Sequence, residues 1–175
     1  MFPDHTPESA PPAARPAMAA TAKKFGRVPP AVARLATSPE LLNGFLKLNA
    51  IFESTTLPAL DREVLVMTVA VRNGCHICVE MHTAALEGMA ASPELVAALR
   101  AQSPLPSPQL AALRRFVLTV MDTTGDVPAE ELTAFTRAGY TARNALEVVL
   151  GIGTYTLSTF ANRLTGAPLH EVSAV

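Results

Sequence analysis

The sequence has little of several features that would point to particular classes of protein. Its 175 residues include two cysteines, and aromatic residues make up 5% of the chain. Two cysteines do not make a disulfide framework in a chain of this length. Without a recognisable secretory signal, a lone pair indicates redox or metal chemistry instead. Fourteen basic residues against fifteen acidic ones leave a formal charge of −1, so the composition argues against a nucleic-acid partner.

Long apolar runs are also missing. The longest uncharged ones, residues 64–71 and 148–157, are far shorter than the ~18–20 residues that span a bilayer. The first twenty residues carry Asp4, Glu8 and five prolines, which prevents the apolar core of a signal peptide from forming. We therefore expect a cytoplasmic protein with no membrane partner.

What the chain does contain favours packed helices. Apolar residues make up 49% of it, and alanine and leucine dominate over β-branched and aromatic types. Its length fits one domain with a sizeable core. Residues 1–17 are rich in proline and alanine without periodicity, so we expect them to be a disordered or extended arm. The prediction is an all-α fold with a single domain over residues 18–175.

Helix boundaries can be predicted from local signals. A serine followed by a proline occurs at Ser38, Ser92 and Ser107, a pattern typical of an N-cap and first helical position. The run at 64–71 is rich in β-branched residues and would suit a buried strand. A lone strand among helices would leave its backbone unpaired, so we predict a helix there. The predicted helices cover one or two short segments in 18–36, then 38–54, 61–73 with Asp61 as N-cap, 75–89, 92–100, a longer one from 107, 128–138 and 141–164.

Both cysteines and two of the four histidines fall in one stretch, EVLVMTVAVRNGCHICVEMHTAAL, at residues 63–86. Cys75 and Cys78 form a C-x-x-C pair, and His82 follows Cys78 by four residues. The three side chains are therefore predicted to share one face of a helix. Glu63 lies in the preceding apolar segment, where a carboxylate is costly unless it has a partner. We predict that these four residues form the functional site.

A C-x-x-C pair at the start of a helix can cycle between a dithiol and a disulfide. Attack requires a thiolate, and a free cysteine with a pKa of ~8.5 is mostly protonated at neutral pH. The N-terminal end of the helix favours ionisation of Cys75, whereas His82 favours Cys78, and the residues alone leave both open. Glu63 can hold His82 in one tautomer, or take its proton directly or through a water.

Two other interpretations of the cluster remain. The cysteines can be inert, buried small apolar residues. They can also be zinc ligands, with His82 and either Glu63 or His76 completing the set. Structural zinc sites usually draw their ligands from two separated pairs, and no second cysteine pair exists here. His76 is predicted to face solvent.

The pattern Glu63, Cys75, Cys78 and His82 resembles the AhpD-like alkylhydroperoxidase branch of the carboxymuconolactone decarboxylase family. The specific match runs from Glu63 through the end of NGCHICVEMHTAAL. The preceding LPALDREVLVMTVAV resembles the lead-in helix of the family, and FANRLTGAPLHE resembles the ending of its peroxidase-related members. The resemblance implies an all-α fold, helical protomers that assemble as trimers or hexamers, and no metal or organic cofactor.

The resemblance also implies a role for each site residue. Cys78 would be the peroxidatic thiolate, activated by His82, with Glu63 drawing the proton away through water. Cys75 would resolve the sulfenic acid as a disulfide. A hydroperoxide would be the substrate, and a dithiol donor of lipoyl or thioredoxin-like type would reduce the Cys75–Cys78 disulfide back to the dithiol. One departure is Ile77, where the best-known family peroxidase has a histidine, so an auxiliary relay role at that position is lost.

The resulting hypothesis is a thiol-dependent hydroperoxide reductase with an antioxidant role. The alternative within the family is decarboxylation of a muconolactone, a reaction that does not need a redox C-x-x-C. A third hypothesis is a module whose cysteines sense redox state or bind metal without turnover. Peroxide turnover with a dithiol donor separates the first hypothesis from the other two.

Overall fold

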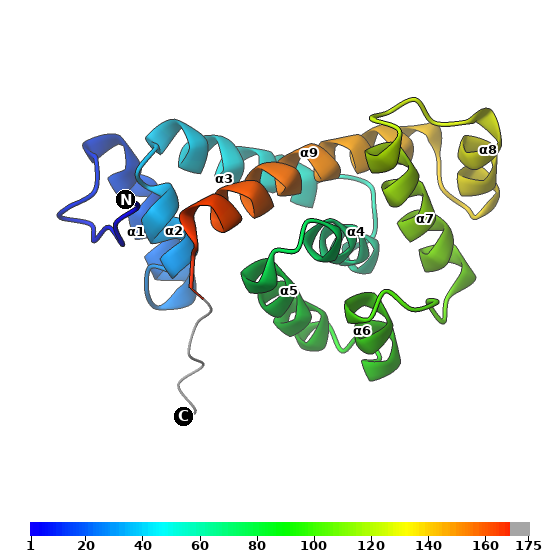
Figure 1. Ribbon diagram of the computed structural model, residues 1–175, viewed down its shortest axis with the longest axis horizontal. Coiled ribbons are helices and arrows are strands. Elements are labelled where there is room, and N and C mark those ends of the chain that lie inside the picture. The colour runs from blue at the N-terminus through cyan, green and yellow to red at the C-terminus, as the bar shows by residue number, and fades with distance from the viewer. Residues whose placement is uncertain (169–175) are drawn as a thin grey trace.

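The computed structural model describes residues 1–168, and in that part of the chain helices joined by short turns make up the whole fold (Figure 1). The all-α prediction is confirmed. No helix among these residues is long and apolar enough to cross a membrane. Residues 169–175, the end of the predicted domain and of FANRLTGAPLHE, lie outside the described part. The elements are η1 (Pro12–Ala14), α1 (Arg15–Phe25), α2 (Pro30–Leu35), α3 (Pro39–Glu53), α4 (Ala59–Arg72), α5 (His76–Gly88), α6 (Pro93–Arg100), α7 (Pro108–Asp122), α8 (Ala129–Arg137) and α9 (Ala142–Thr165).

The three predicted Ser-Pro helix starts are confirmed. Ser38, Ser92 and Ser107 are the N-cap residues of α3, α6 and α7, each followed by proline. Each hydroxyl accepts a hydrogen bond from the backbone N–H three residues on, at 3.3, 3.2 and 3.3 Å. Thr141 caps α9 in the same way and forms a reciprocal capping box with Asn144. These bonds satisfy backbone donors that the first helical turn leaves free.

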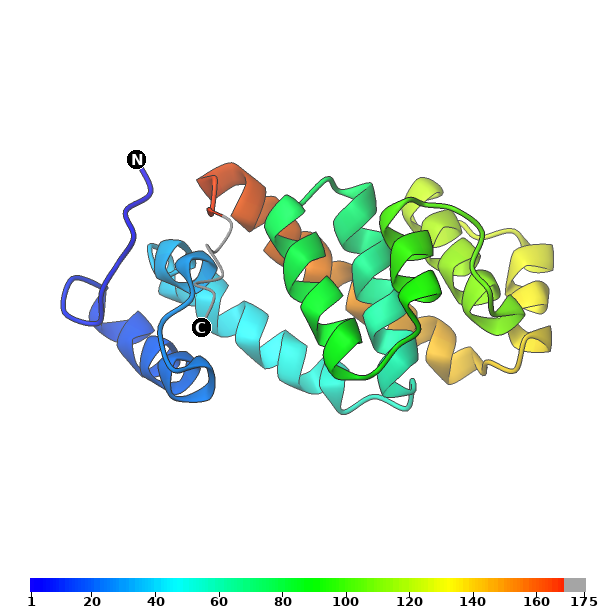
Figure 2. The ribbon, with the colours of Figure 1, turned by 90° about the horizontal axis from the view of Figure 1, so that it is seen from below.

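Helix α4 lies at the centre of the fold. It packs against α5, α6, α7 and α9, and Figure 2 shows α4, α5 and α6 running side by side across α9. Residues 63–70 of α4 are all buried. Neighbours on every side explain why this segment is apolar apart from Glu63 and Thr68, and its backbone is satisfied within the helix despite the β-branched residues.

The predicted N-cap of α4 is wrong by three residues. The helix begins at Ala59, with Pro58 in the N-cap position. Asp61 is instead buried and accepts a hydrogen bond from the hydroxyl of Tyr140 at 2.7 Å. Burial, followed by this bond to a carboxylate, raises the pKa of Tyr140 above its ordinary value. Asp61 thus has a tertiary partner, which local sequence does not reveal.

The first seventeen residues differ from the expected disordered or extended arm. They contain η1 and the beginning of α1, and Ala10 and Ala14 are buried in a small cluster with Met18 of α1 and Leu42 of α3. Alanine side chains fit close against α3 without the periodic large apolar residues that mark a helix in sequence. The division of the chain into an arm and one domain stays a prediction.

Helix α9 runs unbroken through GIGTYT, residues 151–156, although this segment is poor in helix-forming residues. A Cβ atom at Gly151 would lie 2.6 Å from Cε2 of Phe52 and 2.8 Å from Cδ2 of Leu65. A glycine at position 151 therefore lets α9 approach α3 and α4 closely.

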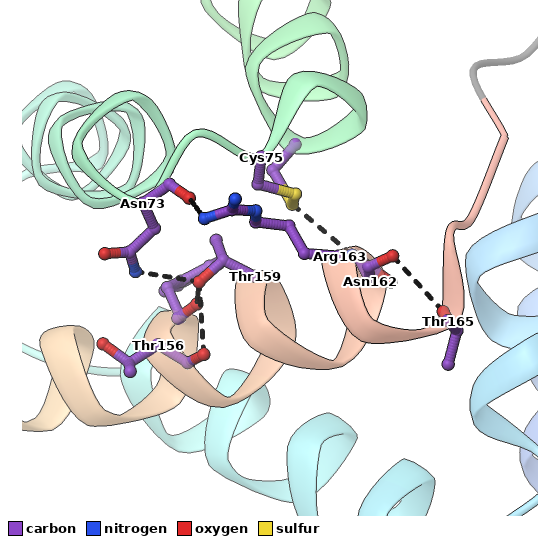
Figure 3. The surroundings of a disulfide bond; sticks show 9 residues. Asn73, Cys75, Thr156, Thr159, Asn162, Arg163 and Thr165 are labelled. Carbon is purple, nitrogen blue, oxygen red and sulfur yellow. Dashed lines mark hydrogen bonds between the residues drawn. A yellow bond between two sulfur atoms is a disulfide. The ribbon is translucent and has the colours of Figure 1, made fainter.

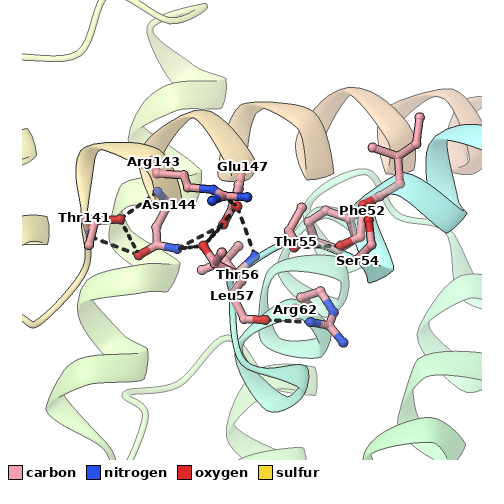
Figure 4. Close-up of polar contacts among 11 residues, drawn as sticks. Phe52, Ser54, Thr55, Thr56, Leu57, Arg62, Thr141, Arg143, Asn144 and Glu147 are labelled. Carbon is pink, nitrogen blue, oxygen red and sulfur yellow. Dashed lines mark hydrogen bonds and ion pairs between the residues drawn. The ribbon is translucent and has the colours of Figure 1, made fainter.

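The start of α9 is tied to the loop between α3 and α4 by a buried carboxylate (Figure 4). Glu147 accepts hydrogen bonds from the backbone N–H and hydroxyl of Thr56, from Nδ2 of Asn144 and from Nε of Arg143, at 2.8–3.0 Å. Burial alone would raise the pKa of Glu147, but these bonds outweigh it and leave the pKa below its ordinary value. The carboxylate is therefore a charged anchor for the loop that leads into α4.

Candidate active site

The turn between α4 and α5 places the C-x-x-C pair. Gly74 has φ +64°, the left-handed conformation that the Asn73-Gly74 pair predicts for a helix end. The backbone N–H of Cys75 donates to the carbonyl of Ala70 at 3.0 Å. The first cysteine is therefore hydrogen-bonded directly to the C-terminus of the central helix.

Cys75 and Cys78 form a disulfide, with Cα atoms 5.3 Å apart. Cys75 is the N-cap residue of α5, and Cys78 is the third residue of that helix. Both sulfurs are thus in its first turn, so the helix dipole acts on both and does not discriminate between them. The side chains are buried, with 1% of Cys75 and 4% of Cys78 exposed.

Glu63 and His82 meet across the interface of α4 and α5. Nδ1 of His82 lies 2.8 Å from Oε2 of Glu63, and both side chains are mostly buried. An ionised carboxylate can only accept, so Nδ1 carries the hydrogen and Nε2 is left with a lone pair. His82 is therefore held in the tautomer that acts as a base through Nε2. Within the described residues, neither side chain is hydrogen-bonded to a cysteine sulfur.

Tyr155 of α9 packs against the imidazole on another side. Its ring meets that of His82 edge to face, with centroids 5.4 Å apart, and its hydroxyl donates to Oδ1 of Asn49 at 2.7 Å. Burial, followed by the negative charges of Glu63 and Glu53, raises the pKa of Tyr155. Tyr155 is therefore a neutral, buried support for the His82 ring.

Helix α9 also reaches the cysteine turn, as Figure 3 shows. Nδ2 of Asn162 donates to Sγ of Cys78 at 3.4 Å, and Arg163 donates to the backbone carbonyl of Asn73. The side chain of Asn73 donates to Oγ1 of Thr159 at 2.9 Å. A third helix thus holds the turn in place together with α4 and α5.

Sequence reasoning missed these α9 residues. Tyr155, Thr159 and Asn162 are spaced by four and three positions, so they share one helix face. Polar groups recurring on the buried face of an otherwise apolar helix are the signal that points to them.

The surroundings of the disulfide are apolar. Ala31 of α2, Ala70, Ile77 and Ala167 pack with the two cysteines in one cluster. Ile77 thus fills core space where the family peroxidase has a histidine, and His76 is exposed as predicted. Within residues 1–168, no three His, Cys, Asp or Glu side chains are grouped so as to hold a metal ion.

The model of the carboxymuconolactone decarboxylase family matches residues 39–117. This segment runs from α3 into α7 and contains all four predicted site residues. The resemblance to this family is confirmed. Among curated proteins, none matches the sequence significantly.

Solved structures share the AhpD-like fold over nearly the whole chain. The alkylhydroperoxidase AhpD core of a peroxidase-related protein from Ralstonia eutropha JMP134 superposes with a TM-score of 0.85, at 21% identity over 97% of this chain and 92% of that one. A peroxidase-related protein from Silicibacter sp. TM1040 superposes with a TM-score of 0.80. The two sequences are 19% identical, and the match covers 97% of this chain and 90% of that one. A cysteine-to-alanine variant of the debrominase Bmp8, in complex with 2,3,4-tribromopyrrole, gives 0.78, at 14% identity over 98% and 92%. At these identities the likeness establishes the AhpD-like fold alone.

Proposed function

We propose that this protein is a thiol-dependent reductase of organic hydroperoxides. The observation that carries the proposal is the Cys75–Cys78 disulfide one helical turn from a His82 that Glu63 holds as a base. A redox pair beside a base is what thiol attack on a peroxide needs. The family match over these residues supports the same reaction class.

In the first half of the cycle, Nε2 of His82 takes the proton from the thiol of Cys78. The thiolate attacks the terminal oxygen of the hydroperoxide, the S–O bond forms and the O–O bond breaks. The alkoxide leaves with the proton from His82 as an alcohol. Cys78 is now a sulfenic acid, oxidised by two electrons.

In the second half, the thiolate of Cys75 attacks the sulfur of Cys78. The S–S bond forms, the S–O bond breaks, and hydroxide leaves with a proton as water. The 5.3 Å separation of the Cα atoms suits this bond without movement of the helix start. An external dithiol of lipoyl or thioredoxin-like type then reduces the disulfide by thiol–disulfide exchange.

We also propose that the protein assembles as a homo-oligomer. The support is a series of exposed apolar side chains on α9, which comprises Leu146, Val149, Phe160 and Leu164. Such surfaces are typical of helical proteins that pack against copies of themselves. Analytical ultracentrifugation of the full chain tests this: a trimer or hexamer is expected, and a monomer contradicts it.

The function is tested by stopped-flow oxidation of the reduced protein with cumene hydroperoxide, followed by mass spectrometry of the product. We expect a Cys75–Cys78 disulfide to form much faster than a free thiol reacts, and Cys78→Ser to abolish the reaction. A rate no higher than that of a free thiol would overturn the proposal and favour a sensor role. Decarboxylation of a muconolactone by Cys78→Ser protein would favour the decarboxylase.

The same experiment distinguishes hydroperoxides from a second class of substrate, brominated pyrroles. The debrominase Bmp8 was crystallised with 2,3,4-tribromopyrrole, and a dithiol can supply the two electrons that replace one bromine by hydrogen, with bromide released. We therefore use that compound as a competing oxidant. Disulfide formation faster with tribromopyrrole than with the hydroperoxide would contradict the peroxide assignment.

A further inference from the structure

Asn162 lies outside the residues that match the family model, yet its side chain is the group bonded to the reactive sulfur. Its amide nitrogen is 3.4 Å from Sγ of Cys78, and the side chain is 6% exposed. A disulfide sulfur accepts hydrogen bonds and cannot donate them. The amide therefore turns its N–H, and not its carbonyl, toward the sulfur.

The other end of the same amide has no partner. Within residues 1–168, the buried side-chain polar atoms that lack a hydrogen bond are Nε of Arg62 and Oδ1 of Asn162. A buried acceptor without a donor is costly, so its retention next to a sulfur calls for an explanation. Oδ1 belongs to the same small planar group whose Nδ2 contacts Sγ of Cys78, so the unpaired acceptor lies in the immediate surroundings of the sulfur.

We propose that Asn162 prepares Cys78 for peroxide and holds the oxygen it receives, an inference that rests on the proposed function. Its N–H stabilises the thiolate of Cys78, because a donor aimed at an anion favours the ionised form. Its Oδ1 accepts the O–H hydrogen of the terminal peroxide oxygen. That O–H stays on sulfur after the O–O bond breaks, so the same acceptor holds the sulfenic acid.

The proposal also assigns a substrate preference. An O–H next to the electrophilic oxygen is present in hydroperoxides and absent from dialkyl peroxides and alkyl halides. Oδ1 therefore distinguishes hydroperoxides from other thiol-reactive molecules, because its buried lone pairs are paired only when an O–H enters.

Other groups around Cys78 also affect its ionisation. The titratable and charged side chains on the surrounding elements are Cys75 before α5, Asp61, Arg62, Glu63 and Arg72 of α4, His76, Glu80, His82 and Glu87 of α5, and Arg143, Glu147, Tyr155 and Arg163 of α9. Arg34 of α2 is bonded to Asp4 and to the carbonyls of Thr165 and Gly166. A substitution at Asn162 alters none of these side chains, so the contribution of Asn162 to the ionisation of Cys78 can be measured separately.

The test compares Asn162→Leu and Asn162→Asp in a Cys75→Ser background, where Cys78 is the single thiol. Leucine has a similar shape and removes both the N–H and Oδ1, whereas aspartate removes the N–H, retains an acceptor and adds a negative charge when it is ionised. The control is Thr154→Val, on the same helix, because the buried hydroxyl of Thr154 bonds only to the carbonyl of Leu150 of its own helix.

The first measurement is the pH profile of alkylation of Cys78 by iodoacetamide. We expect Asn162→Leu to raise the thiol pKa by about one unit, a tenfold loss of thiolate at neutral pH, Asn162→Asp to raise it at least as much because of its added charge, and Thr154→Val to leave it unchanged. An unchanged profile in both Asn162 variants overturns the role of the N–H. This measurement needs no peroxide, so it stands even if the protein fails to react with one.

The second measurement is the rate with cumene hydroperoxide at a pH where the thiol is fully ionised in every variant. There the alkylation rate of Asn162→Leu recovers to that of the parent, while its hydroperoxide rate stays at least about tenfold lower. Recovery of both rates overturns the role of Oδ1. If the parent reacts with iodoacetamide but not with hydroperoxide, the proposed function fails instead.

Discussion

Glu63 and His82 are nineteen positions apart in the sequence, and their side chains meet at 2.8 Å between α4 and α5. The carboxylate has no need of a nearby cation, because the imidazole N–H satisfies it in a buried setting. This pairing directs the free nitrogen of His82, and it underlies the first of the following predictions.

His82→Ala is expected to raise the thiol pKa of Cys78 and to slow its alkylation about tenfold at neutral pH, since the thiol loses the imidazole that takes its proton and balances the thiolate charge. His76→Ala is the matched control, because His76 is an exposed histidine on the same helix. The measurement is the iodoacetamide rate against pH in the reduced protein. Equal profiles for the two variants would contradict the role of His82.

Cys75→Ser is expected to accumulate a sulfenic acid at Cys78 after one equivalent of hydroperoxide, because the resolving thiol is missing. Trapping with dimedone followed by peptide mass spectrometry locates it. Cys78→Ser is the reciprocal variant, in which no sulfenic acid is expected. A trapped adduct at Cys75 of that variant, and none at Cys78 of the other, would reverse the assignment.

Gly151→Ala is expected to lower the free energy of unfolding by about 1–3 kcal/mol, because the added methyl group overlaps Phe52 and Leu65. Gly153→Ala is the control two residues away, where a Cβ meets nothing within 4 Å. There alanine is expected to stabilise the helix by about 0.5–1 kcal/mol. Urea denaturation of both variants measures the difference, and a stabilised Gly151→Ala would refute the close approach of α9.

The pH dependence of stability is expected to include a contribution from Glu147, whose pKa is lowered in the folded protein. Between its folded and ordinary values the unfolded chain binds more protons, so stability rises with pH in that range. The contribution is complete above the ordinary value of 4.5 and is lost as the pH falls through the folded value. Glu147→Gln should reduce the dependence of the free energy of unfolding on pH in this range. It should also lower the free energy of unfolding at neutral pH by about 1–3 kcal/mol.

The control for that experiment is Glu130→Gln, which alters an exposed glutamate in the first turn of α8. It is expected to retain the acid-side slope of the parent. Urea midpoints measured from pH 3 to pH 7 provide the comparison. If both variants keep the slope of the parent, the hydrogen bonds of Glu147 do not affect stability as argued.

The sequence was sufficient where structure depends on neighbours in the chain. Ser38, Ser92 and Ser107 cap their helices through bonds to residues three positions on, so the pattern alone locates the starts. The end of α4 is also set locally, because Gly74 adopts the left-handed conformation that glycine readily takes after a helix. Glu63 and His82 were grouped by their spacing and by the family resemblance, and the structure brings them together.

Contacts across long sequence separations were not predictable. Asn162 and Cys78 are 84 positions apart, and Asp61 and Tyr140 are 79 apart. Each polar side chain has ordinary local explanations, such as a cap or a solvent-facing helix position, that do not depend on the distant partner. Only the packing of α9 and of the α8–α9 turn against α4 and α5 selects the distant partner over these local interactions.

The burial of the disulfide beneath Ala31 and Ala167 has a kinetic consequence for the proposed cycle. A dithiol donor has to reach a sulfur in line with the S–S bond, and both cysteines are almost fully buried among residues that include Ala31 of α2 and Ala167 after α9. Exposure of the bond therefore precedes electron delivery. We expect chemically different dithiols to converge on one limiting rate at high concentration, set by how often the protein uncovers its own sulfur.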